Sequence, residues 1–141
     1  KKDVEYIYYD NLTKMAKDCD VLICIIPGGP STHKIVDAEV IEALGPKGTL
    51  INVSRGSVVD ESALIDALKS GKLGWAGLDV FESEPAVPEA LRDLPNTVLL
   101  PHVGSGTVET RAAMGALTVD NLLKHLKDGT VISAVPECAH L

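Results

Sequence analysis

Four polar side chains follow successive apolar stretches of the chain, and their chemical types suggest a ligand-binding site. Arg55, Asp79, Glu84 and His102 each come just after a predicted strand, and ligands of open α/β sheets bind at the carboxyl ends of the strands. Arg55 is the clearest candidate, because its planar fork can hold a carboxylate with two parallel hydrogen bonds. Each residue taken alone also fits an ordinary structural role in a turn or loop, so only their joint arrangement predicts a site.

Arg55 lies in a stretch, residues 52–64, that reads NVSRGSVVDESAL and has the pattern of a strand, a turn and a helix. The apolar run at residues 49–53 leads into this stretch, and residues 54–56 turn the chain. Asp60 suits the N-cap position of the following helix. One face of that helix carries three apolar residues, Leu64, Ala67 and Leu68.

The rest of the chain repeats this alternation of strand-like and helix-like segments with short connections. Strands are predicted at residues 21–26, 49–53, 75–80 and 98–100, with a further β-type run at residues 4–9. Helices are predicted at residues 12–17, 37–44, 60–70 and 107–127. The uninterrupted apolar run at residues 21–26 predicts a strand buried on both faces. The alternation predicts an α/β fold in which helices cover both faces of a parallel sheet.

Composition narrows the classes of partner. The chain has 141 residues and a net charge of −7, with acidic residues scattered along it. A nucleic-acid partner is not expected, because binding phosphates needs a clustered basic face. No apolar run reaches the roughly 20 residues that a membrane helix needs, and no signal peptide is recognisable.

The cysteines do not suggest disulfides or a metal site. Cys19, Cys24 and Cys138 are odd in number and form no C-x-x-C pair, which favours reduced thiols and a cytoplasmic protein. We expect the first two to pack in or beside a strand. No set of His, Cys and Asp residues has the spacing of metal ligands on one face, so no metal is expected.

Four motifs together resemble those of the NAD(P)-dependent D-2-hydroxyacid dehydrogenases. They are CDVLICIIPGGPSTHKIV at residues 19–36, NVSRGSVVDESAL at 52–64, GLDVFESEP at 77–85 and LLPHVGSGTVETR at 99–111. The resemblance runs over residues 21–121 in the right order. The turn at residues 27–30 and the ending PHVGSGTVETR look most like the glyoxylate/hydroxypyruvate reductase branch.

The resemblance implies an oxidoreductase that reduces a small 2-oxo acid, such as glyoxylate or hydroxypyruvate, to the 2-hydroxy acid. His102 would protonate the carbonyl oxygen, since histidine exchanges protons near neutral pH. Glu84 would bond the other ring nitrogen and fix its tautomer, and Arg55 would bind the substrate carboxylate. Asp79 would bond the nicotinamide carboxamide. The residues expected to line the cofactor are Pro27, Thr32, Val53, Ser54, Arg55, Asp79, His102, Gly104 and Ser105.

One family feature is missing, namely the G-x-G-x-x-G fingerprint of the dinucleotide fold; the nearest string, at residues 104–106, lacks the third glycine. By the resemblance, the chain is the C-terminal portion of a longer enzyme with an incomplete Rossmann-like sheet, and is inactive alone. Residues 1–105 would belong to the dinucleotide-binding domain. Residues 106–141 would form a long helix and a tail that return to an absent substrate domain.

The choice of cofactor and the oligomeric state follow from the same resemblance. Lys1 and Lys2 would fall close to the position where a 2′-phosphate is read, which favours NADP over NAD while leaving both open. Because the family is commonly dimeric, we expect a homodimer.

Three alternatives remain open on the sequence alone. The same motifs occur in cofactor-regulated binding proteins of this fold, which control partner association without turnover. Another branch of the family, such as phosphoglycerate dehydrogenase, would differ in substrate. A truncated structural fragment would bind no cofactor and catalyse nothing.

Overall fold

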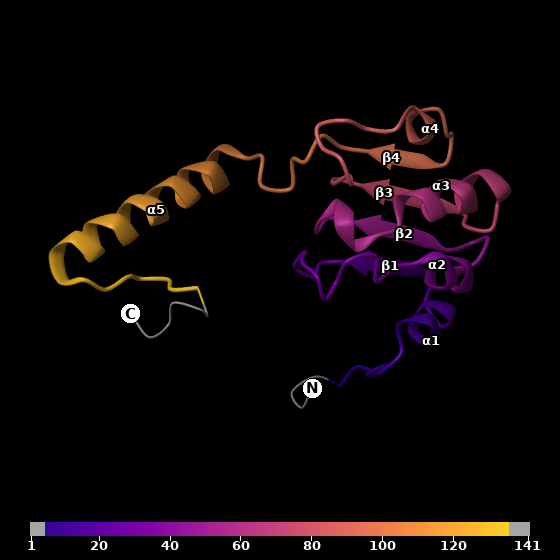
Figure 1. Cartoon of the computed structure of the whole chain (residues 1–141), viewed down its shortest axis with the longest axis horizontal. Coiled ribbons are helices and arrows are strands. Elements are labelled where there is room, and N and C mark those ends of the chain that lie inside the picture. Colours follow the sequence, from indigo (N-terminus) through magenta and orange to yellow (C-terminus); the bar gives the residue numbers. More distant parts are fainter. Residues whose placement is uncertain (1–4, 136–141) are drawn as a thin grey trace. The chain divides into compact units, whose positions relative to one another are not determined.

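The computed structural model describes residues 5–135, so the predictions for Lys1, Lys2 and Cys138 lie outside the described residues. The chain forms two compact units, Lys1–Val103 and Gly104–Leu141. Figure 1 shows the first as a sheet with short helices and the second as one long helix with a following tail.

The first unit is built on a four-stranded parallel sheet. Its strands are β1 (Val21–Cys24), β2 (Thr49–Asn52), β3 (Trp75–Leu78) and β4 (Thr97–Leu99), adjacent in the order β1-β2-β3-β4 (Figure 1). Leu50 of β2 lies opposite Leu22 of β1 and Ala76 of β3. All three pairs are parallel, so the four strands run in the same direction and their carboxyl ends lie at one edge of the sheet. Parallel strands of this kind need crossover connections.

One helix precedes β1 and three lie in the connections between strands, and side-chain caps set where the first three begin. They are α1 (Leu12–Lys17), α2 (Ala38–Leu44), α3 (Glu61–Ser70) and α4 (Glu89–Arg92). The Asn11, Asp37 and Asp60 side chains accept hydrogen bonds from the backbone N–H groups of the first turns of α1, α2 and α3. Such caps satisfy donors that the helix itself leaves unpaired.

The hydrophobic core of this unit lies on one face of the sheet. Side chains from all four helices pack there against β1, β2 and β3 in a single cluster that includes Leu22, Leu50, Leu78 and Leu91. Along β1 the residues alternate between exposed and buried, and Ile25 just beyond it is 77% exposed.

Two expectations from the apolar run at residues 21–26 and from the alternating pattern need correction. β1 is buried on one face and not on both, and the inner strands β2 and β3 alternate in the same way, because the core packs on one face of the sheet. Within residues 5–103 helices cover one face, while Trp75 and Val98 on the other face are exposed. The parallel sheet and the α/β class are confirmed.

Smaller differences concern the ends of elements. Residues 5–9 form no strand, and the exposed side chains Tyr6 and Ile7 lack the packing that would favour one. The strand predicted at residues 75–80 is shorter, and the sequence pattern does not predict α4. The turn after β2 includes a 3-10 helix, η1 (Gly56–Val58).

The second unit is the helix α5 (Val108–Asp128), which the sequence predicts almost to the residue. Thr107 caps its beginning, and Gly129 ends it in the left-handed conformation, with a φ of 76°. Asn121 ties the tail to the helix, because its Oδ1 accepts hydrogen bonds from the N–H groups of Ile132 and Ser133. No residue of α5 is buried.

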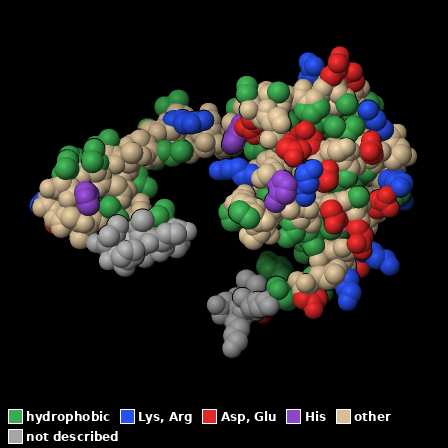
Figure 2. Space-filling view, viewed as in Figure 1, with side chains coloured by type: hydrophobic (Ala, Val, Ile, Leu, Met, Phe, Trp, Pro, Cys, Tyr) green, Lys and Arg blue, Asp and Glu red, His purple; other side chains and the backbone are tan. Residues whose placement is uncertain are grey.

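Surface properties add two observations. In the view of Figure 2, Asp and Glu side chains are interspersed with Lys and Arg over the first unit. Within residues 5–135, no helix is both long and apolar enough to span a membrane.

The position of the core yields a stability prediction. Leu50 is 0% exposed, so Leu50→Ala should lower the free energy of unfolding of the chain by about 2–5 kcal/mol through lost burial and a residual cavity. Val98→Ala, on the exposed face, should cost less than about 0.5 kcal/mol. Urea unfolding measures both, and equal losses would contradict a one-faced core.

Candidate functional site

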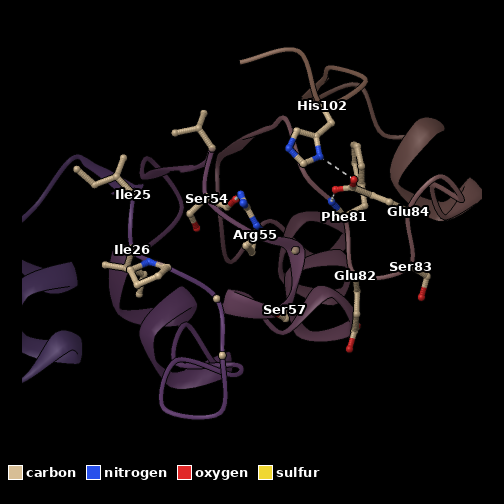
Figure 3. A pocket seen from close by; sticks show the side chains of 15 residues that line it. Ile25, Ile26, Ser54, Arg55, Ser57, Phe81, Glu82, Ser83, Glu84 and His102 are labelled. Carbon is tan, nitrogen blue, oxygen red and sulfur yellow. Dashed lines mark hydrogen bonds and ion pairs between the residues drawn. The ribbon is translucent and has the colours of Figure 1, made fainter. Parts of the chain in front are cut away.

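A pocket of about 970 Å³ lies at the carboxyl edge of the sheet (Figure 3). Its walls come from the loops that follow β1 and β2, from the loop after β3 and from His102. Its lining residues are Ile25, Ile26, Pro27, Gly28, Gly29, Val53, Ser54, Arg55, Gly56, Ser57, Phe81, Glu82, Ser83, Glu84 and His102. The structure therefore brings together Arg55, Glu84 and His102, which are far apart in the sequence.

Arg55 is placed by the turn after β2, and a buried amide holds that turn. Asn52 Oδ1 accepts hydrogen bonds from the Ser54 N–H, at 3.0 Å, and from the Ser54 hydroxyl, at 2.9 Å. Its Nδ2 donates to the carbonyl oxygen of Arg55 at 2.9 Å. Sequence reasoning missed Asn52, although an Asn between a buried strand and a polar turn is a signal for this kind of side-chain-closed turn.

Two glycines let the pocket walls approach each other closely. A Cβ atom on Gly56 would lie 2.0 Å from the carbonyl carbon and oxygen of Phe81, so the turn after β2 packs backbone to backbone on the loop after β3. A Cβ on Gly28 would lie 2.9 Å from Cγ of Arg55. The side chain of Arg55 therefore crosses directly over Gly28.

His102 and Glu84 form a hydrogen-bonded pair in the pocket wall. His102 Nδ1 lies 2.7 Å from Glu84 Oε2 (Figure 3), and Glu84 Oε1 accepts a hydrogen bond from the Phe81 N–H at 2.9 Å. The His102 side chain is 46% exposed. The bond with His102, and then that from Phe81, lower the pKa of Glu84 below its ordinary value, since both favour the carboxylate. The pair thus holds a charged carboxylate against one ring nitrogen and leaves Nε2 for another partner.

The backbone at His102 is in the left-handed region, with a φ of 55°, which is uncommon for a residue other than glycine. Asp79, only 4% exposed, holds the next residue, because its Oδ1 accepts a hydrogen bond from the Val103 N–H at 2.7 Å. A strained backbone of this kind often marks a functional position. Asp79 therefore has a structural partner in addition to any ligand.

The remaining candidate residues divide into two groups. Pro27, Val53 and Ser54 line the pocket. The Thr32 hydroxyl closes its own turn by donating to the carbonyl oxygen of Pro27 at 2.7 Å. Gly104 and Ser105 begin the second unit. A part in cofactor binding stays a prediction for all of these residues.

Two further kinds of chemistry, metal binding and thiol reactivity, depend on the described His, Cys, Asp and Glu residues. Within residues 5–135 no cluster of three or more His, Cys, Asp or Glu could hold a metal ion. Cys24 is a buried free thiol, and burial raises its pKa to about 11, which disfavours the reactive thiolate. As expected, Cys19 and Cys24 lie beside and in β1.

Comparison with known proteins identifies the family. Residues 1–104 match the model of the D-isomer specific 2-hydroxyacid dehydrogenases, NAD binding domain. The chain belongs to this family, as its four motifs predict.

Similar proteins include several reductases. The chain is 52% identical over 135 residues to hydroxyphenylpyruvate reductase from Plectranthus scutellarioides and 53% identical to glyoxylate/hydroxypyruvate reductase A from Arabidopsis thaliana. A crystal structure of NADPH-dependent glyoxylate/hydroxypyruvate reductase from Sinorhizobium meliloti, in complex with NADP and malonate, matches with a TM-score of 0.96 and 52% identity. Each match covers 96–97% of this chain but only 43% of the relative, so the chain spans less than half of the length of these proteins.

The close approach at Gly56 yields a prediction. Gly56→Ala should separate the turn carrying Arg55 from the loop carrying Glu84, because its Cβ meets backbone that cannot give way. We expect the free energy of unfolding to fall by about 1–3 kcal/mol, the usual cost of overpacking. Gly77→Ala is the matched control, since the nearest atom to its Cβ is Ile51 Cγ1 at 3.7 Å. Similar thermal unfolding of the two variants would contradict the packing described.

The Glu84–His102 pair yields a prediction about pH. By NMR, the carboxyl carbon of Glu84 should report a pKa below the ordinary value of a glutamate, because of the bonds from His102 and Phe81. Because this pKa is lower in the folded state, Glu84 contributes stability above its ordinary pKa and loses it as the pH falls through the lowered value. His102→Ala should raise this pKa part of the way to the ordinary value, because the hydrogen bond from the Phe81 N–H remains. His125→Ala is the control. An unchanged pKa of Glu84 in the His102→Ala variant would contradict the described effect of the Glu84–His102 bond.

Proposed function

We propose that the protein containing this chain reduces small 2-oxo acids to 2-hydroxy acids by hydride transfer from NAD(P)H. The observation that carries the proposal is the joint placement of Arg55 and the Glu84–His102 pair in one pocket at the carboxyl edge of the sheet. Family membership supports it, as do the names of the relatives.

The pocket residues fit the nicotinamide end of such a cofactor. Exposed apolar side chains, Ile25 and Val53, offer surfaces for a flat ring, and Gly28 and Gly29 in the lining let a ligand approach the backbone. The chain contains no G-x-G-x-x-G string, so we assign it no pyrophosphate-binding turn. When bound, the reduced nicotinamide supplies the hydride.

The chain's own residues supply binding, orientation and a proton. Arg55 binds the substrate carboxylate with its guanidinium and thereby places the carbonyl group. His102 donates a proton from Nε2 to the carbonyl oxygen as that oxygen gains negative charge. Glu84 accepts the hydrogen bond from Nδ1, which fixes the ring orientation and stabilises the positive imidazolium. Asp79, through Val103, holds the backbone beside His102.

Further parts of the proposal rest on the relatives. The NADPH-dependent enzyme from Sinorhizobium meliloti, crystallised with NADP, favours NADP over NAD, and the names of the relatives favour glyoxylate or hydroxypyruvate. We propose that residues 1–105 complete a dinucleotide-binding domain and that residues 106–141 return to a substrate domain. A homodimer and a cytoplasmic location stay predictions.

The proposed roles predict different kinetic losses in the full-length protein. His102→Gln should lower kcat by roughly 10²–10⁴-fold, the usual contribution of general acid catalysis. Arg55→Lys should raise KM for the 2-oxo acid about tenfold or more, because lysine cannot make the paired bonds. His125→Gln, on exposed α5, should behave as wild type.

Oxidation of NADPH and of NADH with glyoxylate, hydroxypyruvate and pyruvate measures these effects. Absent turnover of the wild type with every acid, despite binding of the reduced cofactor, would overturn the proposed reaction and favour a cofactor-regulated binding protein. Full activity of His102→Gln would remove His102 from its role.

A further inference from the structure

The side chain of Asn52 is the most deeply buried polar group near the pocket. Asn52 is 1% exposed, and burying an amide is costly unless its hydrogen bonds are made. All three hydrogen bonds described above go to Ser54 and Arg55, two and three residues further on. Every hydrogen bond described for the Asn52 side chain is thus made to the turn that carries Arg55.

The turn needs both a donor and an acceptor at this position. Oδ1 faces two donors on Ser54, whereas Nδ2 faces the carbonyl oxygen of Arg55. That same carbonyl oxygen also accepts the Val58 N–H at 3.1 Å, so both of its acceptor sites are used. An ionised aspartate has the same size as asparagine but can only accept hydrogen bonds. Its second oxygen, in the place of Nδ2, would face the carbonyl oxygen of Arg55 and repel it.

These bonds restrict the backbone from which the guanidinium extends. Arg55 is extended, with φ −144° and ψ 145°, directly before η1. Its side chain then crosses Gly28, where no Cβ is present to deflect it, and its Nη1 donates to the carbonyl oxygen of Ser54. The origin of the side chain is therefore held by Asn52, and its path by Gly28.

We infer that Asn52 is a positioning residue that orients Arg55 for binding the substrate carboxylate. This inference rests on the proposed function and deepens it, because it assigns carboxylate affinity to a residue that does not line the pocket. Misplacement of a binding group by a fraction of an ångström weakens binding and rate. Loss of the Asn52 amide should therefore resemble partial loss of Arg55.

Asn96 offers a matched structural control. Its Nδ2 also donates to backbone carbonyl oxygens, of Gly74 at 3.0 Å and of Leu68 at 3.5 Å. It precedes β4, whereas Asn52 ends β2, so it lies at the opposite edge of the parallel sheet. Asn96→Ala should lower the thermal midpoint and leave KM for the 2-oxo acid within about twofold of wild type.

The test measures KM for the 2-oxo acid and the Kd of NADPH in the full-length protein. Asn52→Ala should raise KM about tenfold and change the Kd of NADPH by a clearly smaller factor, because the amide acts mainly on carboxylate binding. In an Arg55→Lys background the same substitution should add less than about twofold, since residues that act through one another are not additive. An unchanged KM in Asn52→Ala, or full additivity with Arg55→Lys, would overturn the inference.

Asn52→Asp keeps the test decisive if the alanine variant fails to fold. A protonated aspartic acid can donate to the Arg55 carbonyl oxygen as the amide does, so its KM, relative to wild type at the same pH, should recover as the pH is lowered. A constant ratio across pH would contradict the positioning role.

A readout without turnover separates this inference from the proposed function. Malonate can be titrated calorimetrically into the NADPH-bound wild type and the Asn52→Asp variant. If the wild type reduces no acid, the proposed reaction fails, while weaker malonate binding by the variant still supports the inference. Equal malonate affinity would overturn the inference even if the wild type is active.

Discussion

Parallel pairing of the strands is the constraint on which the rest of this structure depends. Each strand must be re-entered from the same end, so every connection crosses over a face of the sheet and every carboxyl end reaches one edge. The loops that carry Arg55, Glu84 and His102 leave from this edge. Their convergence is therefore a consequence of the strand direction.

Convergence of the loops does not by itself fix the positions of the side chains in the site. Hydrogen bonds from buried side chains fix them. The Asn52 amide holds the turn of Arg55, and the Asp79 carboxylate holds the backbone beside His102. The two are connected, because the Asp79 N–H donates to the carbonyl oxygen of Asn52 at 3.0 Å. Side chains that do not line the pocket thus determine how the exposed ones are presented.

The family relationship and the geometry support each other without being equivalent. The family shows the class of fold and of chemistry, whereas the pocket shows which side chains of this chain lie together. The chain spans 43% of the length of the relatives it matches. In the proposed function, the pocket described is accordingly one wall of the site of the whole protein. This wall carries His102, Glu84 and Arg55.

The sequence by itself determined the order of the four sheet strands, the helix cap at Asp60 and the span of the long helix α5, because these depend on local patterns and on neighbours in the chain. It could not determine that β1 is an edge strand with one buried face, since an apolar run looks the same in either position. Only the tertiary structure decided that Gly56 packs on Phe81 and that the Asn52 amide donates a hydrogen bond to the carbonyl oxygen of Arg55. Backbone contacts and hydrogen-bond partners of this kind depend on three-dimensional distances, which residue types and spacing do not contain.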